Sequence, residues 1–303
     1  MTSICVIFNP TAKGEKARRF RHHLDGIATE CALKLTAGVG DARRLAAEAV
    51  REGCDTVVAA GGDGTLNEVV NGLGDVPDGL VHTRLGVLPL GTVNVFAREM
   101  AIPTRLESAW DTIRQGHEMV IDLPKVEYGV GDTRQRRYFA QLAGAGLDAR
   151  AIELVQWELK KRFGPFAYVL AGLNALLAAP SQINAANGKE SVMGELVLIG
   201  NGRLYGGPYR IFPKADLQDG LLEVCVFPRV NWLTLLRCAP LLLMRGLVPA
   251  SAARVFQAEQ LALTSSASTP FEVDGELIGR LPATFSVERS RLRVVVPAQR
   301  AAE

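Results

Sequence analysis

The first third of the chain alternates short apolar segments with helical patterns, and few folds accommodate that order. Each apolar segment ends in a polar or glycine-containing turn, and the helical segments carry their apolar residues on one side. Parallel strands need such crossover helices, so the alternation predicts a doubly wound, mostly parallel α/β sheet with helices on both faces. We expect strands at Ile4–Phe8, Ala32–Leu35, Thr56–Ala60 and Leu85–Leu88, and helices at Glu15–Leu24, Asp41–Arg51, Thr65–Leu73 and Asn94–Met100.

The alternation stops near Asp122, and most later segments are short apolar runs separated by Gly, Asp and Pro. A chain of 303 residues exceeds the usual size of one domain. We therefore predict an α/β domain over 1–122 and a β-rich, sandwich-like domain over 123–290, with 291–303 able to pack back on the first. Helices near 150–179 and 231–246 and a polar loop over Gln182–Ser191 interrupt the second domain. Its expected strands are Lys125–Tyr128, Tyr138–Ala143, Gly194–Ile199, Tyr209–Phe212, Leu222–Phe227, Gln260–Thr264, Phe271–Val273, Phe285–Val287 and Leu292–Val296.

Charge and cysteine usage exclude several classes of protein. Lys and Arg number 34 against 32 Asp and Glu, and this even balance argues against a nucleic-acid partner. The five scattered cysteines form neither a disulfide framework nor a zinc motif, which favours a reducing cytoplasm. Two long apolar stretches, Phe163–Ala179 and Trp232–Val248, are too short or too interrupted to span a bilayer. These stretches predict buried or amphipathic helices, or a surface that contacts a membrane. The basic run Lys160–Arg162 predicts either a solvated helix face or a contact for anionic lipid.

The most informative segment is Gly61-Gly62-Asp63-Gly64-Thr65-Leu66-Asn67-Glu68, which follows a strand and opens a helix. Paired glycines let phosphate oxygens approach main-chain N–H groups, and a helix N-terminus favours an anion. Asp63 would repel phosphate, so we expect it to hold Mg²⁺ or to orient a hydroxyl. The simpler alternative is a tight turn in which Asp63 caps the helix.

Three further turns are expected at the same edge of the sheet. They are Asn9-Pro10-Thr11-Ala12-Lys13-Gly14, Thr36, and Gly91-Thr92-Val93-Asn94. In a doubly wound sheet these turns leave the carboxyl ends of the strands, where ligands bind. Together they predict a nucleotide site, although neither the dinucleotide fingerprint nor the P-loop motif is present.

Two acidic turns stand out in the second domain. Asp274-Gly275-Glu276 places two carboxylates on one face if the strand continues, which suits a general base and a group that binds metal or orients the base. Asp-Gly is also the commonest hairpin signal, so a simple turn remains an alternative. In the second turn, Asp219 and nearby carbonyls of Asp216–Leu221 could hold a hard cation or only shape the chain.

These motifs, in this order, resemble the diacylglycerol kinase catalytic domain family, in particular the bacterial YegS-like lipid kinases. Sphingosine and ceramide kinases are related, and the Gly-Gly-Asp-Gly block is shared with NAD kinases. The residues that carry the resemblance are Asn9-Pro10, Gly61–Glu68, Pro89–Thr92, Asn94, Phe96–Arg98, Asp219-Gly220 and Asp274–Glu276. The resemblance covers nearly the whole chain, and it implies an NAD kinase/diacylglycerol kinase-like α/β domain followed by a β-sandwich.

The resemblance also implies residue roles. Asp274 would take the proton from the lipid hydroxyl, with Glu276 beside it and Asp63 acting at the phosphates through Mg²⁺. A structural Mg²⁺ would be held by the carboxylate of Asp219 and main-chain oxygens of Asp216 and Leu221. ATP would be surrounded by Asn9, Pro10, Thr11, Ala12, Lys13, Thr36, Gly61, Gly62, Asp63, Gly64, Thr65, Leu66, Asn67, Glu68, Gly91, Thr92 and Asn94.

The expected activity is ATP- and Mg²⁺-dependent phosphorylation of a hydroxyl of a diacylglycerol-like or sphingoid lipid, in the cleft between the domains. Val93 and Val95 stand where the family commonly has Gly and Asp, so the contacts to substrate are expected to differ. The alternatives are a kinase of a soluble alcohol or nucleotide, similar to NAD kinase, and a nucleotide-binding sensor without turnover. The expected partners are a lipid substrate at the membrane surface and a second copy in a possible homodimer. The expected location is the cytoplasm, transiently at the inner face of the membrane.

Overall fold

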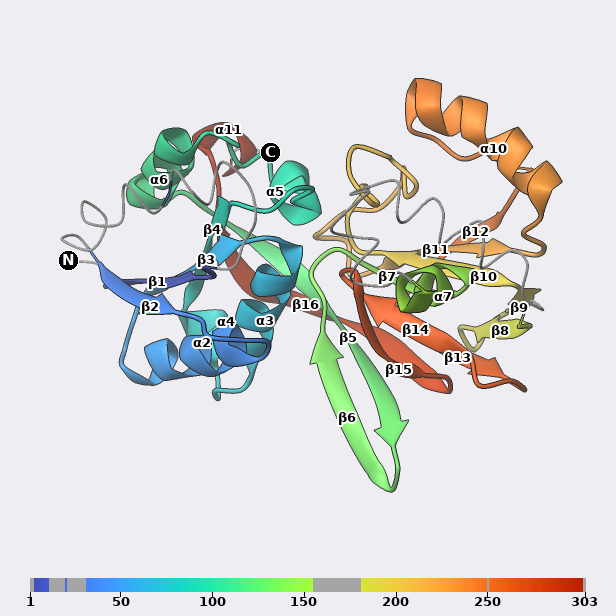
Figure 1. Cartoon of the computed structure of the whole chain (residues 1–303), viewed down its shortest axis with the longest axis horizontal. Helices are drawn as coiled ribbons and strands as arrows, with labels where there is room; N and C mark the ends of the chain where they lie inside the picture. Colours follow the sequence, from blue (N-terminus) through green and yellow to red (C-terminus); the bar gives the residue numbers. More distant parts are fainter. Residues whose placement is uncertain (1–2, 11–19, 21–30, 155–180, 250, 302–303) are drawn as a thin grey trace.

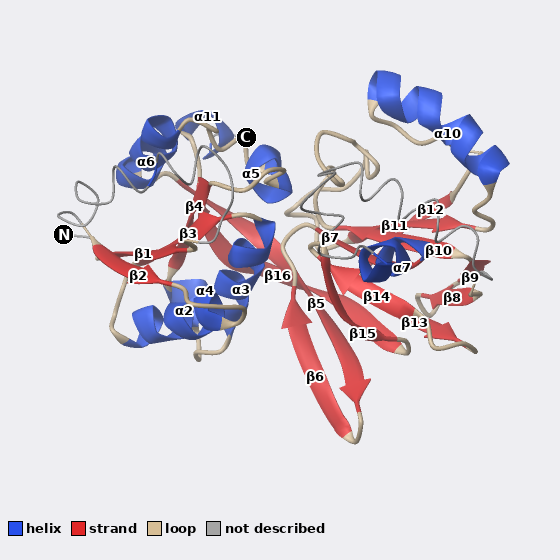
Figure 2. Ribbon diagram, in the orientation of Figure 1, coloured by secondary structure: helices blue, strands red, loops and turns tan. Residues whose placement is uncertain are grey.

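The computed structural model describes residues 3–10, 20, 31–154, 181–249 and 251–301. Figure 1 shows two lobes joined by long strands, and Figure 2 shows that the second lobe is mostly strand. Except for Phe20, the expected helix at Glu15–Leu24 lies outside the described residues, as does most of the one near 150–179. Among the described residues, no helix is long and apolar enough to cross a membrane.

The first lobe contains a parallel sheet in the order β2-β1-β3-β4. All six residues of β3 (Thr56–Gly61) and five of six in β4 (Arg84–Pro89) are buried, as expected for strands covered on both faces. Figure 1 shows helices on the two sides of this sheet. The other elements are β1 (Ile4–Phe8), β2 (Ala32–Leu35), α2 (Asp41–Arg51), α3 (Asp63–Gly74), α4 (Gly79–His82), α5 (Val95–Glu99) and α6 (Leu106–Gln115).

Two 13-residue strands, β5 (Glu118–Val130) and β16 (Ala283–Val295), run from one lobe into the other. They pair antiparallel along most of their length. At Arg293 and Val294, β16 also pairs in parallel with β4, so the end of the chain completes the first sheet. β6 (Thr133–Tyr138) folds back on β5 and forms the hairpin that projects at the bottom of Figure 1.

The second lobe is a β-sandwich, as predicted. The sheet that contains β16 continues through β13, β8 and β9, and a second sheet has the order β12-β11-β10-β7-β14-β15. Apolar residues from both sheets, including Phe271 and Phe285, form one buried core. These strands are β7 (Leu142–Gly146), β8 (Ile183–Ala186), β9 (Ser191–Gly194), β10 (Leu196–Gly200), β11 (Leu222–Phe227), β12 (Arg254–Ala258), β13 (Gln260–Ser265), β14 (Pro270–Val273) and β15 (Glu276–Arg280), and the helices are α7 (Leu147–Leu154), α10 (Trp232–Arg245) and α11 (Ala298–Ala301).

Several expected elements differ from the structure. Gln182–Ser191 is not a loop, because β8 pairs with β9 there. Tyr209–Phe212 is not a strand, and only a single bridge joins Tyr205 to Tyr209. The two strands expected at Phe285–Val287 and Leu292–Val296 are one strand, β16, with a shift in register between Glu288 and Leu292.

Candidate active site

Two glycine turns of the first domain lie directly against each other. A Cβ at Gly91 would lie 2.5 Å from the Cα of Gly62, and a Cβ at Gly61 would lie 2.6 Å from the Cβ of Thr65. Any larger residue at these positions would push the turns apart. Gly62, not Asp63, is the N-cap of α3, and no side chain among the described residues caps that end. The helix therefore presents unsatisfied N–H groups of the kind that bind an anion.

A pocket of about 270 Å³ opens beside this helix end. Three turns that follow β1, β2 and β3 contribute to it, and β15 of the second domain adds Glu276. The sequence did not single out the part of its wall formed by Ala37, Gly38 and Val39, although two glycines before a helix are a usual sign of such a loop. The lining residues are Asn9, Thr36, Ala37, Gly38, Val39, Ala42, Gly64, Thr65, Glu68 and Glu276.

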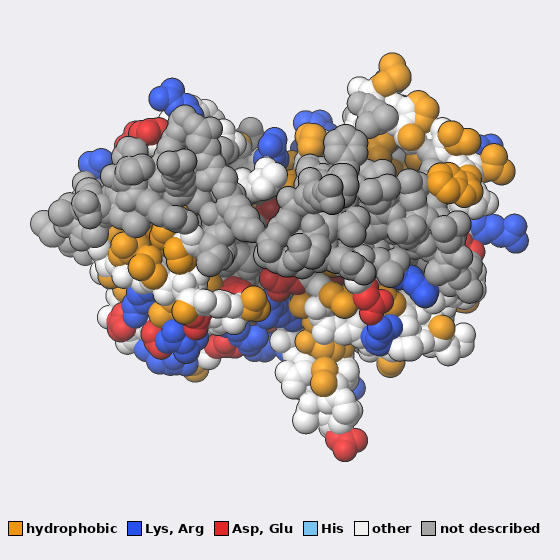
Figure 3. Space-filling view, viewed as in Figure 1, with side chains coloured by type: hydrophobic (Ala, Val, Ile, Leu, Met, Phe, Trp, Pro, Cys, Tyr) orange, Lys and Arg blue, Asp and Glu red, His pale blue; other side chains and the backbone are white. Residues whose placement is uncertain are grey.

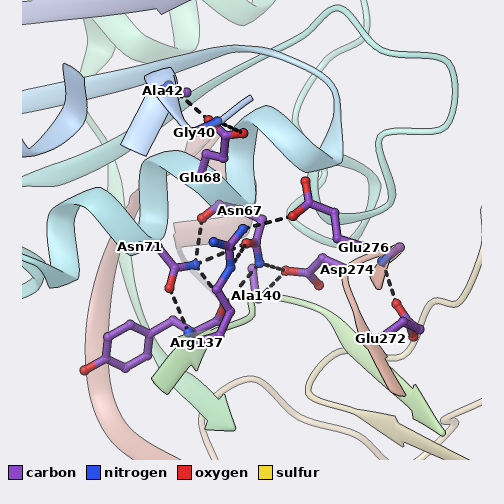
Figure 4. A network of polar contacts seen from close by, with 12 residues as sticks. Gly40, Ala42, Asn67, Glu68, Asn71, Arg137, Ala140, Glu272, Asp274 and Glu276 are labelled. Atoms are coloured by element: carbon purple, nitrogen blue, oxygen red, sulfur yellow. Dashed lines mark hydrogen bonds and ion pairs between the residues drawn. The ribbon is translucent and has the colours of Figure 1, made fainter. Parts of the chain in front are cut away.

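Glu68 lines the pocket, and its carboxylate is bonded to the turn that follows β2. Its carboxylate oxygens accept hydrogen bonds from the N–H groups of Gly40 (2.8 Å) and Ala42 (3.0 Å). Glu68 thereby caps α2 and ties the turn after β2 to α3 (Figure 4). Its role in the site is to position the pocket wall.

The other residues expected around ATP have different surroundings. Leu66 packs in the apolar core of the first domain. The side chain of Asn94 holds its own turn, since its amide donates to the carbonyl of Gly91 (2.7 Å) and its oxygen accepts from the N–H of Gly91 (3.0 Å). Thr92 is exposed at the same turn. Pro10 follows the end of β1, whereas Thr11, Ala12 and Lys13 lie outside the described residues.

Asp274 lies on the tight turn between β14 and β15, and its φ is 47°. The hairpin alternative is therefore correct for the backbone, and the strand does not continue through Asp274. The carboxylate nevertheless faces the first domain. It accepts four hydrogen bonds, from the N–H groups of Ala140, Gln141 and Leu142 and from the Asn67 amide (2.8 Å). Burial raises the pKa of Asp274, and these donors oppose the rise.

Asn67 is the bridge between the two domains. It is fully buried, and besides Asp274 its amide donates to the carbonyl of Tyr138 (3.1 Å). Its oxygen accepts from the Nε of Arg137 (2.9 Å), whose guanidinium also contacts Glu276 (2.9 Å). Figure 4 shows this chain of contacts between α3, β6 and the β14–β15 turn. Arg137 completes the site but was not identified from the sequence.

Glu276 and Asp63 complete the acidic face of the site. A Cβ at Gly64 would lie 3.0 Å from Glu276 Oε1, so the second domain reaches the start of α3 there. Burial raises the pKa of Glu276, and Arg137 opposes the rise. Burial and the neighbouring charge of Asp274 raise the pKa of Asp63 from 3.8 to about 6, against the N–H groups of residues 94–96. The structure thus brings all three expected catalytic carboxylates together.

A second acidic pair lies behind the Asp274 turn. Glu272 is fully buried and Asp148 is half-buried, and one buried oxygen of each has no hydrogen-bond partner in the described part of the chain. Both of these oxygens approach the same point beside Gly144. Burial raises the pKa of both carboxyls, which suits one shared proton between them. The other oxygen of Glu272 accepts from the N–H of Gly275 (2.7 Å), and Tyr205 donates to Asp148.

The expected metal turn is also acidic. Asp219 accepts a hydrogen bond from the N–H of Leu221 (2.8 Å), and Asp216 accepts one from Gln218 (3.0 Å). Burial raises the pKa of Asp219, and the charges of Asp216 and Asp122 add to the rise. A cation would relieve this repulsion. Within the described ranges, however, no group of three acidic, His or Cys side chains is arranged to hold a metal by itself.

Comparisons with known proteins agree along the whole chain. The family model for the diacylglycerol kinase catalytic domain matches residues 3–126, and the model for the YegS C-terminal NAD kinase beta sandwich-like domain matches residues 141–296. A diacylglycerol kinase from Staphylococcus saprophyticus is 31% identical over 299 residues, which cover 96% of this chain and 94% of that protein. A diacylglycerol kinase from Staphylococcus carnosus is 29% identical with the same coverage.

Two solved structures have the same fold. A diacylglycerol kinase from Bacillus anthracis gives a TM-score of 0.77 at 20% identity and covers 98% of each chain. Yeast NADH kinase in complex with NADH gives a TM-score of 0.56 at 10% identity, covering 99% of this chain and 84% of the yeast chain. At these identities the comparison establishes the architecture only.

Proposed function

Because the chain belongs to the diacylglycerol kinase family, we propose that it phosphorylates a lipid hydroxyl with ATP where its two domains meet. Family membership makes it a phosphotransferase with an alcohol acceptor. The acceptor we propose is a diacylglycerol-like or sphingoid lipid. The observation that carries the proposal is the 2.8 Å hydrogen bond between Asn67 and Asp274, which holds a carboxylate of the second domain against the helix that starts at the glycine turn.

The nucleotide is proposed to bind in the pocket beside α3. The start of α3 and the Gly61–Gly62 turn offer main-chain N–H groups to the phosphates. The Gly91 turn supports them from behind, because its own N–H is bonded to Gly61 and Asn94. Thr36 and Val39 form the wall opposite Gly64 and Thr65 in the same pocket. Glu276 lines the same pocket and Asp274 lies two residues away on the β14–β15 turn, so the terminal phosphate is proposed to lie toward them.

Mg²⁺ fits the acidic face of this site. Asp63 is a half-buried carboxyl whose pKa is raised in part by the charge of Asp274, so a divalent cation there would offset unfavourable charge. Mg²⁺ commonly uses one or two carboxylates and completes its coordination with waters and phosphate oxygens, so a single aspartate suffices. When bound, it would neutralise charge that develops on the transferred phosphoryl group. We assign Asp219, with main-chain oxygens of Asp216 and Leu221, as a separate structural site.

Asp274 is proposed to be the general base. It accepts the hydroxyl proton while the lipid oxygen bonds to the terminal phosphorus and the bond to the bridging oxygen breaks, which releases ADP. Its raised pKa favours acceptance of a proton. Because all four donors around it are engaged, the incoming hydroxyl must displace one of them. The Asn67 amide is the one side-chain donor among the four, and the other three donors are main-chain N–H groups.

A soluble acceptor is the second candidate, since the yeast NADH kinase has the same fold. Labelled ATP is offered separately to dispersed diacylglycerol, NAD and a total lipid extract, and the labelled product is identified. Transfer to a lipid supports the proposal, and transfer only to NAD replaces it. Tight ATP binding without transfer to any acceptor would indicate a sensor.

Asp274→Asn tests the base. We expect ATP binding to survive and phosphoryl transfer to fall by about a hundredfold or more. Asp78→Asn is the matched control, because Asp78 is exposed and has a similar positive φ of 56°. Wild-type turnover in a folded Asp274→Asn protein would remove Asp274 from this role.

A further inference from the structure

In the part of the chain that the structure describes, one side of helix α10 has no partner. Leu233, Leu236 and Met244 are 68%, 70% and 83% exposed, and Trp232 at its start is 53% exposed. Arg237 and Pro240 are also exposed. The spacing of three to four residues places Leu233, Leu236, Arg237, Pro240 and Met244 on one side of the helix, which we call the α10 outer face. Figure 3 shows apolar side chains gathered at this corner of the molecule.

The opposite side of α10 is already used for folding. Leu242 packs on the apolar cluster that contains Ile211, Phe212 and Cys225, over one face of the second sheet. The exposed leucines therefore do not serve the core. Exposing three large apolar side chains side by side is unusual for a surface that meets only water.

The charge around the helix has one sign. Residues 224–258 contain four arginines, at 229, 237, 245 and 254, and no Asp or Glu, although the whole chain has a net charge of only +2. Arg229 and Arg237 are exposed. Neither pairs with a carboxylate among the residues that the structure places. An apolar strip with unpaired guanidiniums beside it complements a surface that is apolar inside and anionic outside.

The helix also connects to the edge of the active site. Its C-cap, Gly246, lies against the backbone of residues 208–210. In the same loop, Gly207 lies next to Val93, which is 38% exposed on the turn that supports the nucleotide pocket. Figure 1 shows this loop between α5 and α10. A surface that binds α10 would therefore also lie close to the junction of the two domains.

We propose that the α10 outer face docks on an anionic lipid bilayer, with Leu233, Leu236 and Met244 entering the headgroup region and Arg229 and Arg237 contacting lipid phosphates. The proposal rests on the proposed function for its purpose, since a lipid acceptor has to be reached in a membrane. A helix of 14 residues is about 21 Å long, and it lies along the surface without spanning it. Trp232 at its start suits the boundary between headgroups and water.

A second copy of the chain is the other occupant that an apolar helix face could have. A two-fold dimer through this face would bring the same surface of both copies together. Arg237 would then meet the same basic surface of its partner with no acidic residue on α10 to compensate. Charge therefore favours the bilayer.

Vesicle binding of the whole protein, without ATP and without diacylglycerol, tests the docking surface. The vesicles are phosphatidylcholine alone or phosphatidylcholine with phosphatidylglycerol. We expect the wild type to bind the anionic vesicles, and Leu233→Gln with Leu236→Gln to weaken this binding by about tenfold or more. Arg237→Gln should weaken it by about fivefold and leave binding to phosphatidylcholine unchanged. Trp232 emission should shift to shorter wavelength on binding, and Trp232→Phe should remove that part of the shift.

The matched control is Val130→Gln with Met193→Gln, whose side chains are 53% and 52% exposed but lie on other elements. It should bind like the wild type. Equal binding by the helix variant and the control, or no wild-type binding to either vesicle, overturns the proposal. So does a wild-type dimer that the helix variant splits while its vesicle binding is unchanged.

Activity on short-chain diacylglycerol in detergent separates the two proposals. The helix variant should retain wild-type activity there, because the substitutions are outside the active site. A wild type that transfers phosphate in detergent but binds no vesicles disproves the docking surface alone. A wild type that binds vesicles through α10 but transfers phosphate to no lipid disproves the proposed function alone.

Discussion

Replacing Asp63 by asparagine should stabilise the protein at neutral pH while it removes phosphoryl transfer. Asp63 is half-buried near Asp274, and its pKa is raised from 3.8 to about 6 by burial and by the charge of Asp274. Unfolding returns it to water, where the lower value applies. Between these two pKa values the folded chain retains a proton that the unfolded chain has lost, so stability falls as pH rises through this interval.

The difference between the two pKa values sets the size of the effect. At 1.36 kcal/mol for each pH unit, the ionised Asp63 lowers the free energy of unfolding by about 3 kcal/mol at pH 7. The same linkage gives about 1.6 kcal/mol at pH 5 and about 0.6 kcal/mol at pH 4. Asp63→Asn carries no charge at any of these pH values, and its oxygen can still accept the N–H of Phe96. The variant should therefore gain these amounts over the wild type.

Urea unfolding at pH 7, 5 and 4, in EDTA and without nucleotide, measures the gain directly. Asp41→Asn is a control of opposite sign, because the N–H of Ala37 lowers the pKa of Asp41. Its ionised form stabilises the fold, so that variant should be less stable at pH 7 and the loss should fade as the pH falls. An Asp63→Asn protein that is less stable than the wild type at pH 7, or a gain that is the same at pH 7 and pH 4, would refute the reasoning.

Two other substitutions test the packing around the site. Glu272→Gln should change the free energy of unfolding by less than about 1 kcal/mol, because an amide can still accept from Gly275 and can donate to Asp148. Glu272→Ala should cost about 3 kcal/mol or more in the same urea assay, since it leaves Gly275 and Asp148 without that partner. Equal losses would mean that no proton is shared there. Gly91→Ala should raise the KM for ATP by about tenfold, because its Cβ would lie 2.5 Å from the Gly62 Cα. Gly129→Ala, with open space around its Cβ, should leave the KM unchanged, and an unaffected Gly91→Ala enzyme would contradict the close approach.

The sequence predicted the parts of the fold whose signals are local. The turn from β3 to α3 needs only an apolar strand, two glycines and a helical pattern, and all three lie within about twenty residues. The two-domain class followed from the change in periodicity near Asp122. The exposed strand β6 was missed because its composition, Thr-Arg-Gln-Arg-Arg-Tyr, lacks the apolar alternation of a half-buried strand. Strand β8, Ile-Asn-Ala-Ala, does alternate buried and partly exposed residues, but it has only four residues and lies in a mostly polar segment.

The break expected within β16 has a specific cause. The polar segment Glu288-Arg289-Ser290-Arg291 interrupts the apolar pattern, and Ser290 has a positive φ of 47°. The strand tolerates this irregularity because β5 shifts its register there and resumes pairing at Leu292. Only the partner strand distinguishes a bulge from a turn, and the sequence of one strand does not contain that information.

For the candidate site, the sequence predicted individual residues but not the contacts between them. Its acidic residues were identified one by one from glycine-flanked motifs, whereas Arg137 has no motif and lies on a strand that the sequence did not reveal. Asn67 was expected at the nucleotide because of its place in the glycine block. Its actual contacts reach Asp274, 207 positions away, and residues of β6. Contacts between the domains depend on how the long strands β5 and β16 orient the two lobes, which short sequence motifs do not specify.

The same interdomain contact explains why the turn at Asp274 must be rigid. Asn67 lies on the second turn of α3, and the helix that starts at the glycine turn therefore fixes its position. Asp274 is fixed from its own side by three main-chain N–H groups and, through Gly275, by the buried Glu272. A shift of either support would move the Asp274 carboxylate relative to the start of α3. Burial disfavours the charged forms of Asp148 and Glu272, and the structural contribution of this pair is to hold the Asp274 turn in place against α3.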